Sequence, residues 1–155
     1  MSYRDFINNL SVTPFGVWLV KTFAARVDPL IYKLTGGRYT SSGPLTIPQL
    51  TLTTTGRISG KERTVQLGYT ADGDDVLIVA SNFGGKNHPA WSYNLDANPS
   101  AKIRLGAEDK SVIATRLTDS EKAILWPSIA DTIPQMKTYV TKTERNIKVY
   151  RLRGG

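Results

Sequence analysis

The stretch LTLTTTGRISGKERTVQLGYT, residues 50–70, contains two runs typical of β-strands on either side of a glycine-rich loop. Leu50–Thr54 alternates apolar and hydroxyl side chains, and Thr64–Thr70 returns with an alternation that pairs with the first run. The two runs therefore predict a β-hairpin, and this hairpin indicates a β-rich fold.

The loop of this hairpin, within Thr53–Arg63, has the composition of an anion site. Gly56 and Gly60 are expected to permit positive φ, so that the chain turns sharply and its N–H groups point outward. Guanidinium groups and backbone amides both favour anionic oxygens, and the loop adds Arg57, Lys61, Arg63 and the hydroxyl of Ser59. A phosphate or a cluster of carboxylates suits such a loop. The alternative is a hairpin turn with solvated charges.

Further strands and helices follow the hairpin. Asp72-Gly73 predicts a second turn, and the nearly all-apolar run Val76–Ala80 predicts a central strand. The other expected elements are a helix at His88–Ala97, strands at Ala101–Leu105 and Ser111–Leu117 around the turn Gly106–Lys110, a helix that opens with the capping box Thr118/Glu121, and a last strand at Lys148–Leu152. Short antiparallel strands with a few helices predict an α+β or mostly-β domain, a small barrel with flanking helices.

The amino-terminal third predicts one helix from residue 15 to residue 34. Thr13 followed by Pro14 is typical of a helix start, Gly36-Gly37 of a helix end, and Pro29 is expected to kink or interrupt the helix. Apolar residues recur at three- and four-residue spacing and form one stripe: Phe15, Trp18, Leu19, Phe23, Val27, Leu30, Ile31 and Leu34. The favoured interpretation is a helix that packs this stripe over a sheet. The alternative is a peripheral membrane contact or a wall of a substrate pocket, with Lys21, Arg26 and Lys33 on the flanks.

Length and composition exclude several classes of site. We expect one domain over residues 1–155, with a helical extension (residues 1–43) before the core (residues 44–155). The chain has no cysteine and a single histidine, His88, whereas common zinc and haem sites need several such ligands, so no metal site is predicted. Neither a signal peptide nor a membrane span is recognisable, because the apolar run Val17–Val20 is short, and we expect a cytoplasmic protein.

The net charge of +7 predicts an anionic partner. Nucleic acid, a membrane surface and an acidic small molecule are the three candidates, and charge alone does not choose among them. The basic residues are spread along the chain, with local gatherings at Arg57–Arg63 and Lys142–Arg153.

A second segment with chemical potential is ASNFGGKNHPAWSYNL, residues 80–95. It leaves the predicted central strand, passes through Gly84-Gly85 and enters a helix, an arrangement in which ligands commonly approach backbone amides. Trp91 offers a flat surface for a planar ring or, alternatively, belongs to the core. His88 is expected to be an exposed helix start without a metal or triad partner.

The segments, in this order, resemble the deazaflavin-dependent nitroreductase family. The matching stretches are TTTGRISGKERTVQLGY (53–69), DGDDVLIVASNFGG (72–85), HPAWSYNLDANP (88–99) and a helix with Trp126-Pro127, within about Gln49–Tyr139. The resemblance implies an actinobacterial protein with a split β-barrel fold. It also implies an oxidoreductase that transfers a hydride from reduced coenzyme F420 to an electron-poor acceptor, a quinone or, adventitiously, a nitroaromatic drug.

The resemblance also implies the site residues. It places the tail and the ring of F420 along Arg57, Ile58, Ser59, Lys61, Arg63, Thr64, Val65, Gln66, Leu67 and Gly68, the ring over Val79, Ala80, Ser81 and Asn82, and its side against Ala90, Trp91, Ser92, Tyr93 and Asn94. Tyr139 matches a tyrosine that faces the substrate pocket, and Ser81 a serine that can donate a hydrogen bond.

The chain departs from the nitroreducing members at three positions. Met136 stands where they have a second pocket tyrosine, Asn82 where they have a lysine, and Ile58 where they have a basic residue. These differences leave F420 binding intact and argue against nitro-drug activation.

Two other classes remain open: a split-barrel flavoprotein that binds riboflavin phosphate, and a basic binding module without enzymatic activity. The number of cations at the loop exceeds what one phosphate needs, which favours the tailed deazaflavin. The chemistry resides in the cofactor, and this agrees with the lack of a recognisable triad or carboxylate dyad.

Overall fold

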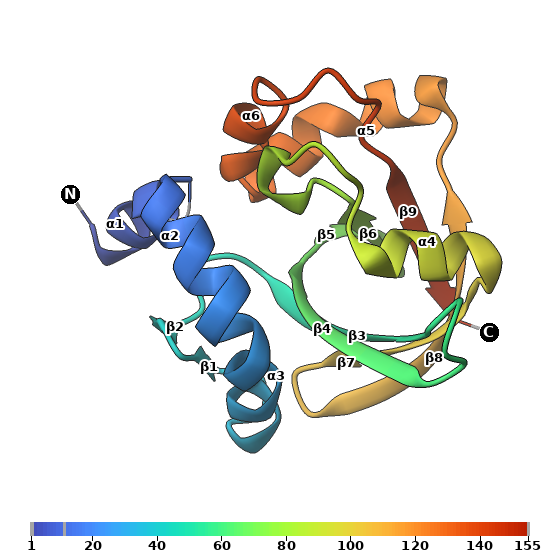
Figure 1. Ribbon diagram of the computed structural model, residues 1–155, viewed down its shortest axis with the longest axis horizontal. Helices are drawn as coiled ribbons and strands as arrows, with labels where there is room; N and C mark the ends of the chain where they lie inside the picture. The colour runs from blue at the N-terminus through green and yellow to red at the C-terminus, as the bar shows by residue number, and fades with distance from the viewer. Residues whose placement is uncertain (1, 11, 155) are drawn as a thin grey trace.

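A computed structural model of the protein describes residues 2–10 and 12–154 (Figure 1). One curled antiparallel sheet has the strand order β4-β3-β7-β8-β9-β6-β5, and β1 pairs with β2 outside it. The strands are β1 Tyr39–Thr40, β2 Gly43–Pro44, β3 Gln49–Thr55, β4 Glu62–Gly68, β5 Thr70–Asp72, β6 Asp75–Val79, β7 Ser100–Leu105, β8 Glu108–Arg116 and β9 Val149–Gly154. The predicted hairpin is β3–β4, and the predicted α+β barrel with flanking helices is confirmed.

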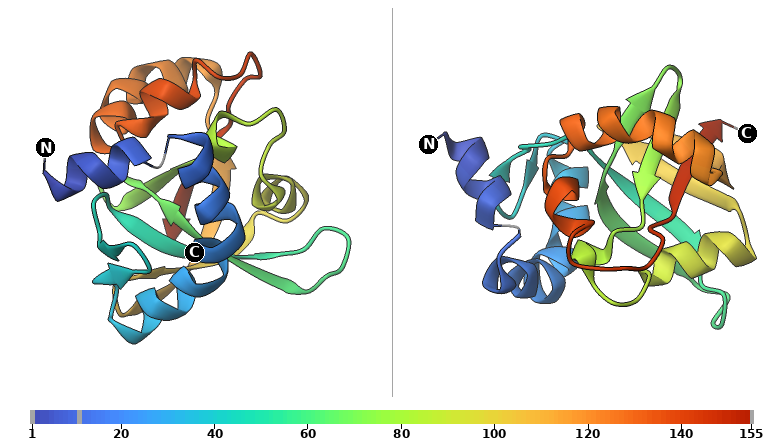
Figure 2. Two further views of the ribbon diagram at one scale, coloured as in Figure 1. Left: turned by 60° about the vertical axis from the view of Figure 1, so that its left-hand side comes forward. Right: turned by 90° about the horizontal axis from the view of Figure 1, so that it is seen from above.

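The helices surround the curled sheet (Figures 1 and 2). They are α1 Tyr3–Leu10, α2 Pro14–Leu19, the π-helical turn η1 Val20–Ala24, α3 Ala25–Leu34, the 3-10 turn η2 Asn82–Gly84, α4 Ala90–Ala97, α5 Asp119–Thr132 and α6 Gln135–Tyr139. The segment α1–α3 runs along one side of the sheet, α5 and α6 cover another part, and α4 lies at the open side of the curl.

The core consists of two clusters that share strand β6. Alternating side chains of β6 point to opposite faces, so Val76 and Ile78 join one cluster and Leu77 and Val79 join the other. Trp91 and Leu95 of α4 belong to the first cluster, which fills the inside of the curl. Burial on both faces explains why this strand reads as a nearly continuous apolar run.

The start and end of the amino-terminal helix agree with the prediction. The Thr13 side chain accepts a hydrogen bond from the N–H of Gly16, with Pro14 at the first turn. Pro29 lies inside α3 without ending it, and the irregular turn η1 lies directly before α3. Helix α1 and the small β1–β2 hairpin have no counterpart in the prediction.

The expectation that the apolar stripe packs onto the sheet is wrong for most of its members. Phe15 is 63% exposed and Leu34 is 75% exposed, and Trp18, Phe23 and Leu30 are also more than half exposed. The opposite side of α3 faces the sheet: the Tyr32 hydroxyl donates to the carbonyl of Gln49 (2.9 Å) and accepts from the N–H of Gly106 (2.7 Å). This anchor turns the stripe outward.

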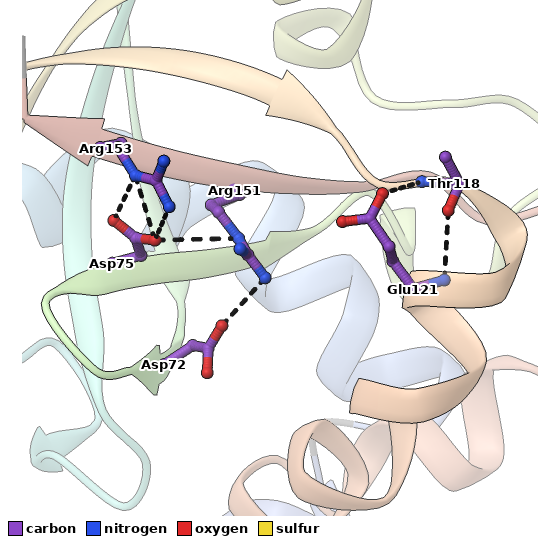
Figure 3. Close-up of polar contacts among 6 residues, drawn as sticks. All are labelled: Asp72, Asp75, Thr118, Glu121, Arg151 and Arg153. Carbon is purple, nitrogen blue, oxygen red and sulfur yellow. Dashed lines mark hydrogen bonds and ion pairs between the residues drawn. The ribbon is translucent and has the colours of Figure 1, made fainter.

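Other boundaries shift by a few residues. The turn before β8 is shorter than predicted, because Gly106 alone has the left-handed conformation (φ 62°) and the polar residues Glu108–Lys110 already pair with β7. Helix α4 begins at Ala90, after Pro89. The capping box is confirmed, with Thr118 and Glu121 exchanging two hydrogen bonds of 3.2 Å (Figure 3).

Candidate functional site

The basic loop between β3 and β4 is closed by its own hydrogen bonds. The N–H of Gly56 donates to the carbonyl of Lys61 (2.8 Å), and the N–H of Gly60 donates to the carbonyl of Gly56 (2.8 Å). The N–H of Lys61 donates to the hydroxyl of Ser59 (3.2 Å). Most loop amides therefore do not point outward as predicted. Within the described part of the chain, the amides of Ile58 and Ser59 have no acceptor in the protein.

The two loop glycines have different roles. Gly60 has a positive φ of 68°, as predicted. Gly56 does not, and a Cβ there would lie 2.6 Å from the Ser59 hydroxyl oxygen, so this glycine is needed for close packing of the loop.

The loop is fixed to helix α4, so the structure brings the first and second predicted segments together. The N–H of Arg57 donates to Oδ1 of Asn94 (3.0 Å), and Nδ2 of Asn94 donates to the hydroxyl of Thr54 (3.0 Å). The guanidinium of Arg57 lies 5.3 Å from the centre of the Tyr93 ring. Asn94 is therefore a bridge between the loop and the helix.

Three cations of this region have no carboxylate partner. Among the described residues, no Asp or Glu lies within 4 Å of the charged groups of Arg57, Lys61 or Arg63. All three side chains are exposed. Their charge is available to an anionic ligand.

In the second basic gathering, Lys142–Arg153, three cations are paired with carboxylates. Arg151 pairs with Asp72 (2.9 Å), and Arg153 pairs with Asp75 (2.7 Å), as Figure 3 shows. Lys148 pairs with Asp96 at 2.6 Å. The hydrogen bond from Arg153 holds the pKa of the Asp75 carboxyl below its usual value.

Strand β4 divides the predicted residues between its two faces. Val65 and Leu67 pack against the core cluster that contains Trp91. The hydroxyl of Thr64 lies 3.0 Å from that of Thr53, and Gln66 accepts from Thr51 (2.9 Å), both on the other face. Because side chains alternate along a strand, Thr64 and Gln66 lie on the opposite face of the sheet from Val65 and Leu67.

The opposite face of the sheet carries a groove of about 560 Å³. Strands β3, β4, β7 and β8 and helix α3 form it, and it contains no predicted site residue except Thr64. The groove therefore lies apart from the segments that the sequence assigned to the site.

The end of β6 leads into a turn of unusual backbone geometry. Ala80 and Ser81 are buried, and the next three residues are left-handed: Asn82 (φ 45°), Phe83 (φ 56°) and Gly84 (φ 73°). Left-handed conformations are unfavourable for residues with a Cβ. The turn must therefore be held by its surroundings.

Helix α4 presents a different aromatic ring from the one predicted. Trp91 is buried and packs edge-on against Tyr150, at 5.7 Å between ring centres. Ser92 is also buried, 2.9 Å from the Tyr150 hydroxyl. Tyr93 is the partly exposed ring of this helix, and Arg57 and Lys148 each lie 5.3 Å from its centre. Of the two readings of Trp91, the structure supports a core residue.

Tyr139 and Met136 of α6 lie on the other side of the turn. The ring of Tyr139 packs edge-on against Phe83, with centres 5.9 Å apart. The turn approaches α6 so closely that a Cβ on Gly84 would lie 2.8 Å from the carbonyl oxygen of Tyr139. Met136, Tyr139 and Ser81 are all buried. The two predicted catalytic residues thus flank the same turn.

Two residues have more contacts than the sequence suggested. His88 lies 2.9 Å, through Nδ1, from Nη1 of Arg145, and its ring contacts Tyr93 edge-on. Burial, Arg145 and Lys148 lower the pKa of His88. Arg145 was not singled out from the sequence, and a lone arginine in an irregular segment gives no signal of its own.

Comparisons with known proteins show the family to which this chain belongs. The family model described as F420H(2)-dependent quinone reductase matches residues 22–153. An F420H(2)-dependent quinone reductase of Mycobacterium tuberculosis is 37% identical over 127 residues, which cover 80% of this chain and 85% of the relative. A solved F420-H2 dependent reductase (FDR-A) has a TM-score of 0.63 and 33% identity, covering 68% of this chain and 94% of that chain.

A further solved structure, described as a domain-swapped dimer, matches with a TM-score of 0.65 and 28% identity. It covers 91% of this chain and 100% of that chain. From the family model and the relatives together, the chain belongs to the F420H(2)-dependent quinone reductase family, a family of oxidoreductases whose cofactor is the deazaflavin F420.

Proposed function

We propose that this protein reduces a membrane-borne quinone, holding the anionic tail of F420 at the β3–β4 loop and its ring at the turn after β6. The family gives the oxidoreductase class and the coenzyme, and thereby sets aside the riboflavin phosphate and binding-module alternatives. The residue roles, the acceptor and its location are the proposal.

The residues of the loop suit the chemistry of this coenzyme, and the observation that carries the proposal is the set of three cations without carboxylate partners. A phosphate and a polyglutamate tail need several cations, and Arg57, Lys61 and Arg63 supply them. The free amides of Ile58 and Ser59 add two donors. One ion pair at contact contributes ~1 kcal/mol in water and up to ~4 kcal/mol at an effective dielectric of 20.

The turn after β6 suits the ring. When bound, F420 supplies the hydride, so the protein has to position the ring and exclude water. Val79 ends β6, which is buried on both faces, the buried residues Ala80 and Ser81 lead from it to Asn82 of η2, and Ala90–Asn94 lie on helix α4. These segments would hold the ring between rigid elements rather than on a mobile loop.

Tyr139 is proposed to stabilise the charge that develops on the acceptor oxygen, with Ser81 as the second hydroxyl. A tyrosine hydroxyl is protonated at neutral pH and can donate to a developing oxyanion. The Phe83 ring contacts the ring of Tyr139, and its centre lies 5.5 Å from Nζ of Lys21. The site is thereby in direct contact with the amino-terminal helical segment.

The substitution Tyr139→Phe tests this role. Turnover of a soluble quinone should fall by about ten- to a hundredfold, or about 1.4–2.7 kcal/mol of transition-state stabilisation. The affinity for F420 should barely change, because the ring and tail contacts remain. Steady-state rates and a fluorescence titration measure the two quantities. Unchanged turnover would mean that Tyr139 only shapes the pocket.

Nitroaromatic reduction is proposed to be a weaker activity than quinone reduction. Met136 is buried beside Tyr139 and offers no hydroxyl where nitroreducing members have a second tyrosine. One donor in place of two leaves less stabilisation for a nitro group. Nitroimidazole turnover that exceeds quinone turnover in the same preparation would contradict this.

The exposed apolar stripe supports a membrane-borne acceptor. A contiguous exposed apolar surface flanked by cations is typical of a helix that rests in a membrane interface. Phe15, Trp18 and Phe23 of α2 and η1 are exposed, and the same helical segment carries the exposed cations Lys21 and Arg26. Within the described residues, no helix is long and apolar enough to cross a membrane. We therefore propose peripheral contact with the cytoplasmic membrane face.

A further inference from the structure

Arg145 holds the turn after β6 from outside. It lies in the irregular segment between α6 and β9, and its guanidinium donates three hydrogen bonds to backbone carbonyls. Nη1 donates to Ala80 (3.0 Å), Nη2 to Ser81 (2.6 Å) and Nε to Gly85 (3.0 Å). Within the described chain the guanidinium has no carboxylate partner, and its one further hydrogen-bond partner is His88.

The three carbonyls bracket the strained residues. Ala80 and Ser81 precede the left-handed residues Asn82 and Phe83, and Gly85 follows them. One rigid, planar guanidinium therefore fixes both ends of the turn at once, which a lysine ammonium with a single centre cannot reproduce. Asn82 adds a bond across the turn, from Nδ2 to the carbonyl of Asn87 (2.8 Å).

The fourth contact of Arg145 requires a neutral histidine. Because the guanidinium has only donors, Nδ1 of His88 must accept, and the ring proton then sits on Nε2. The groups that face His88 are Arg145 and Lys148 after α6, Arg116 on β8, and Asp96 and the Tyr93 ring on α4. Only Asp96 favours the protonated ring, so burial and the three cations lower the pKa of His88 from its ordinary 6.5.

We propose that Arg145 is a positioning residue of the hydride-transfer site: it fixes Ser81 and Asn82 where the cofactor ring is held, and its bond to neutral His88 makes that position sensitive to acid. The inference rests on the proposed function for the identity of the ring. Protonation of His88 would replace an accepted hydrogen bond by two adjacent cations, which loosens the guanidinium and with it both ends of the turn.

Hydrogen exchange and kinetics together test the proposal. In the cofactor-free protein, Arg145→Lys should speed amide exchange at residues 80–88 at least about tenfold while exchange in β3 and β7 stays unchanged. In the quinone assay kcat should fall about tenfold, because small displacements of reacting groups are costly in rate. Arg38→Lys, at an exposed arginine whose side chain makes no hydrogen bond or ion pair in the described chain, is the matched control and should change neither quantity.

The pH profile separates positioning from general stability. In the wild type, kcat should decline in acid with a midpoint below the ordinary histidine value of 6.5, because burial and the neighbouring cations lower the pKa of His88. His88→Asn keeps an acceptor oxygen near the position of Nδ1 and cannot be protonated, so its profile should lose this decline. A purely structural role would lower the melting temperature of Arg145→Lys and leave the kcat of the folded fraction and its pH profile unchanged.

Three results would contradict the inference in whole or in part. Unchanged exchange at residues 80–88 in Arg145→Lys would overturn the inference, as would faster exchange with wild-type kcat. An acid decline that persists in His88→Asn would overturn its pH-dependent part. Absence of F420H2-dependent quinone reduction in the wild type would refute the proposed function instead, and the exchange measurement on the cofactor-free protein would still report whether Arg145 holds the turn.

Discussion

The β3–β4 loop and strand β9 carry similar charge in opposite settings. In the loop, Arg57 and Arg63 are exposed and have no carboxylate within ion-pair distance in the described chain. In β9, Arg151 and Arg153 contact Asp72 and Asp75 across the sheet (Figure 3). An anion that approached β9 would compete with carboxylates already in place, whereas an anion at the loop would not.

Net charge alone therefore does not locate a binding site in this protein. The chain has a formal charge of +7, and both regions stand out as basic in the sequence. Ion pairing decides which region attracts a distant anion, because a cation and a neighbouring carboxylate together carry almost no net charge. The loop is also held against α4, where the N–H of Arg57 bonds Asn94 and its guanidinium contacts the Tyr93 ring.

The largest expected effect is on the loop. Replacing Arg57 and Arg63 together by alanine should weaken F420 binding at least about tenfold, which corresponds to ~1.4 kcal/mol. The loss should shrink at high salt, because screening removes the charge term. Fluorescence titration at low and high ionic strength measures both effects.

The matched control removes the same charge from β9. The double substitution Arg151→Ala with Arg153→Ala should leave F420 affinity within about twofold of the wild type, since those cations are already paired. An equal loss of affinity in the two double variants would show that the coenzyme responds to net charge, and the distinction between the regions would fail.

The exposed apolar stripe of the amino-terminal helical segment is expected to contact lipid. Trp18→Gln with Phe23→Gln should reduce pelleting with anionic vesicles severalfold, because the apolar contact is lost while Lys21 and Arg26 remain. Both side chains are more than half exposed, so the fold should be retained. Ile124→Gln, at an exposed position on α5, is the control.

Equal pelleting of the helix variant and the Ile124 control would show that the exposed stripe does not contact lipid. Quinone reduction with a soluble acceptor should be unaffected in both, since neither substitution reaches the turn. A loss there would point to a wall of the acceptor pocket instead.

The smallest effect concerns the acid stability that β9 contributes. The pKa of Asp75 is lowered by its hydrogen bond from Arg153, so the stability from this pair is present above the ordinary pKa of 3.8 and is lost as pH falls below it. In Arg153→Ala the melting temperature should fall by only a few degrees at neutral pH and should match the wild type at low pH. A constant difference across the range would contradict the assignment.

Features with a local cause were predictable from the sequence. The β3–β4 hairpin follows from alternation on both sides of a glycine loop, and the Thr118/Glu121 box from side-chain and backbone groups three residues apart. The order of three segments along the chain, the loop, the turn after β6 and α4, also matched the pattern of one family. These elements depend on neighbours in sequence.

Features that depend on distant partners were missed. Amphipathic spacing shows that the amino-terminal helix has an apolar side, and Tyr32 decides that this side faces away from the sheet. Arg145 acquires its role only because β9 returns beside β6. The two-residue period of a strand predicts that Thr64 and Gln66 face away from Val65. This division was missed because the family resemblance assigned the whole range, residues 64–68, to the site.

A comparison of two cofactors on the purified protein tests whether the β3–β4 loop binds the tail of F420. Titration with F420 and with riboflavin phosphate, at the same low ionic strength, gives two dissociation constants. If Arg57, Lys61 and Arg63 bind the tail, F420 should bind at least about tenfold more tightly, because riboflavin phosphate offers them a single anionic group. Equal affinities, or tighter binding of riboflavin phosphate, would contradict the assignment of the loop.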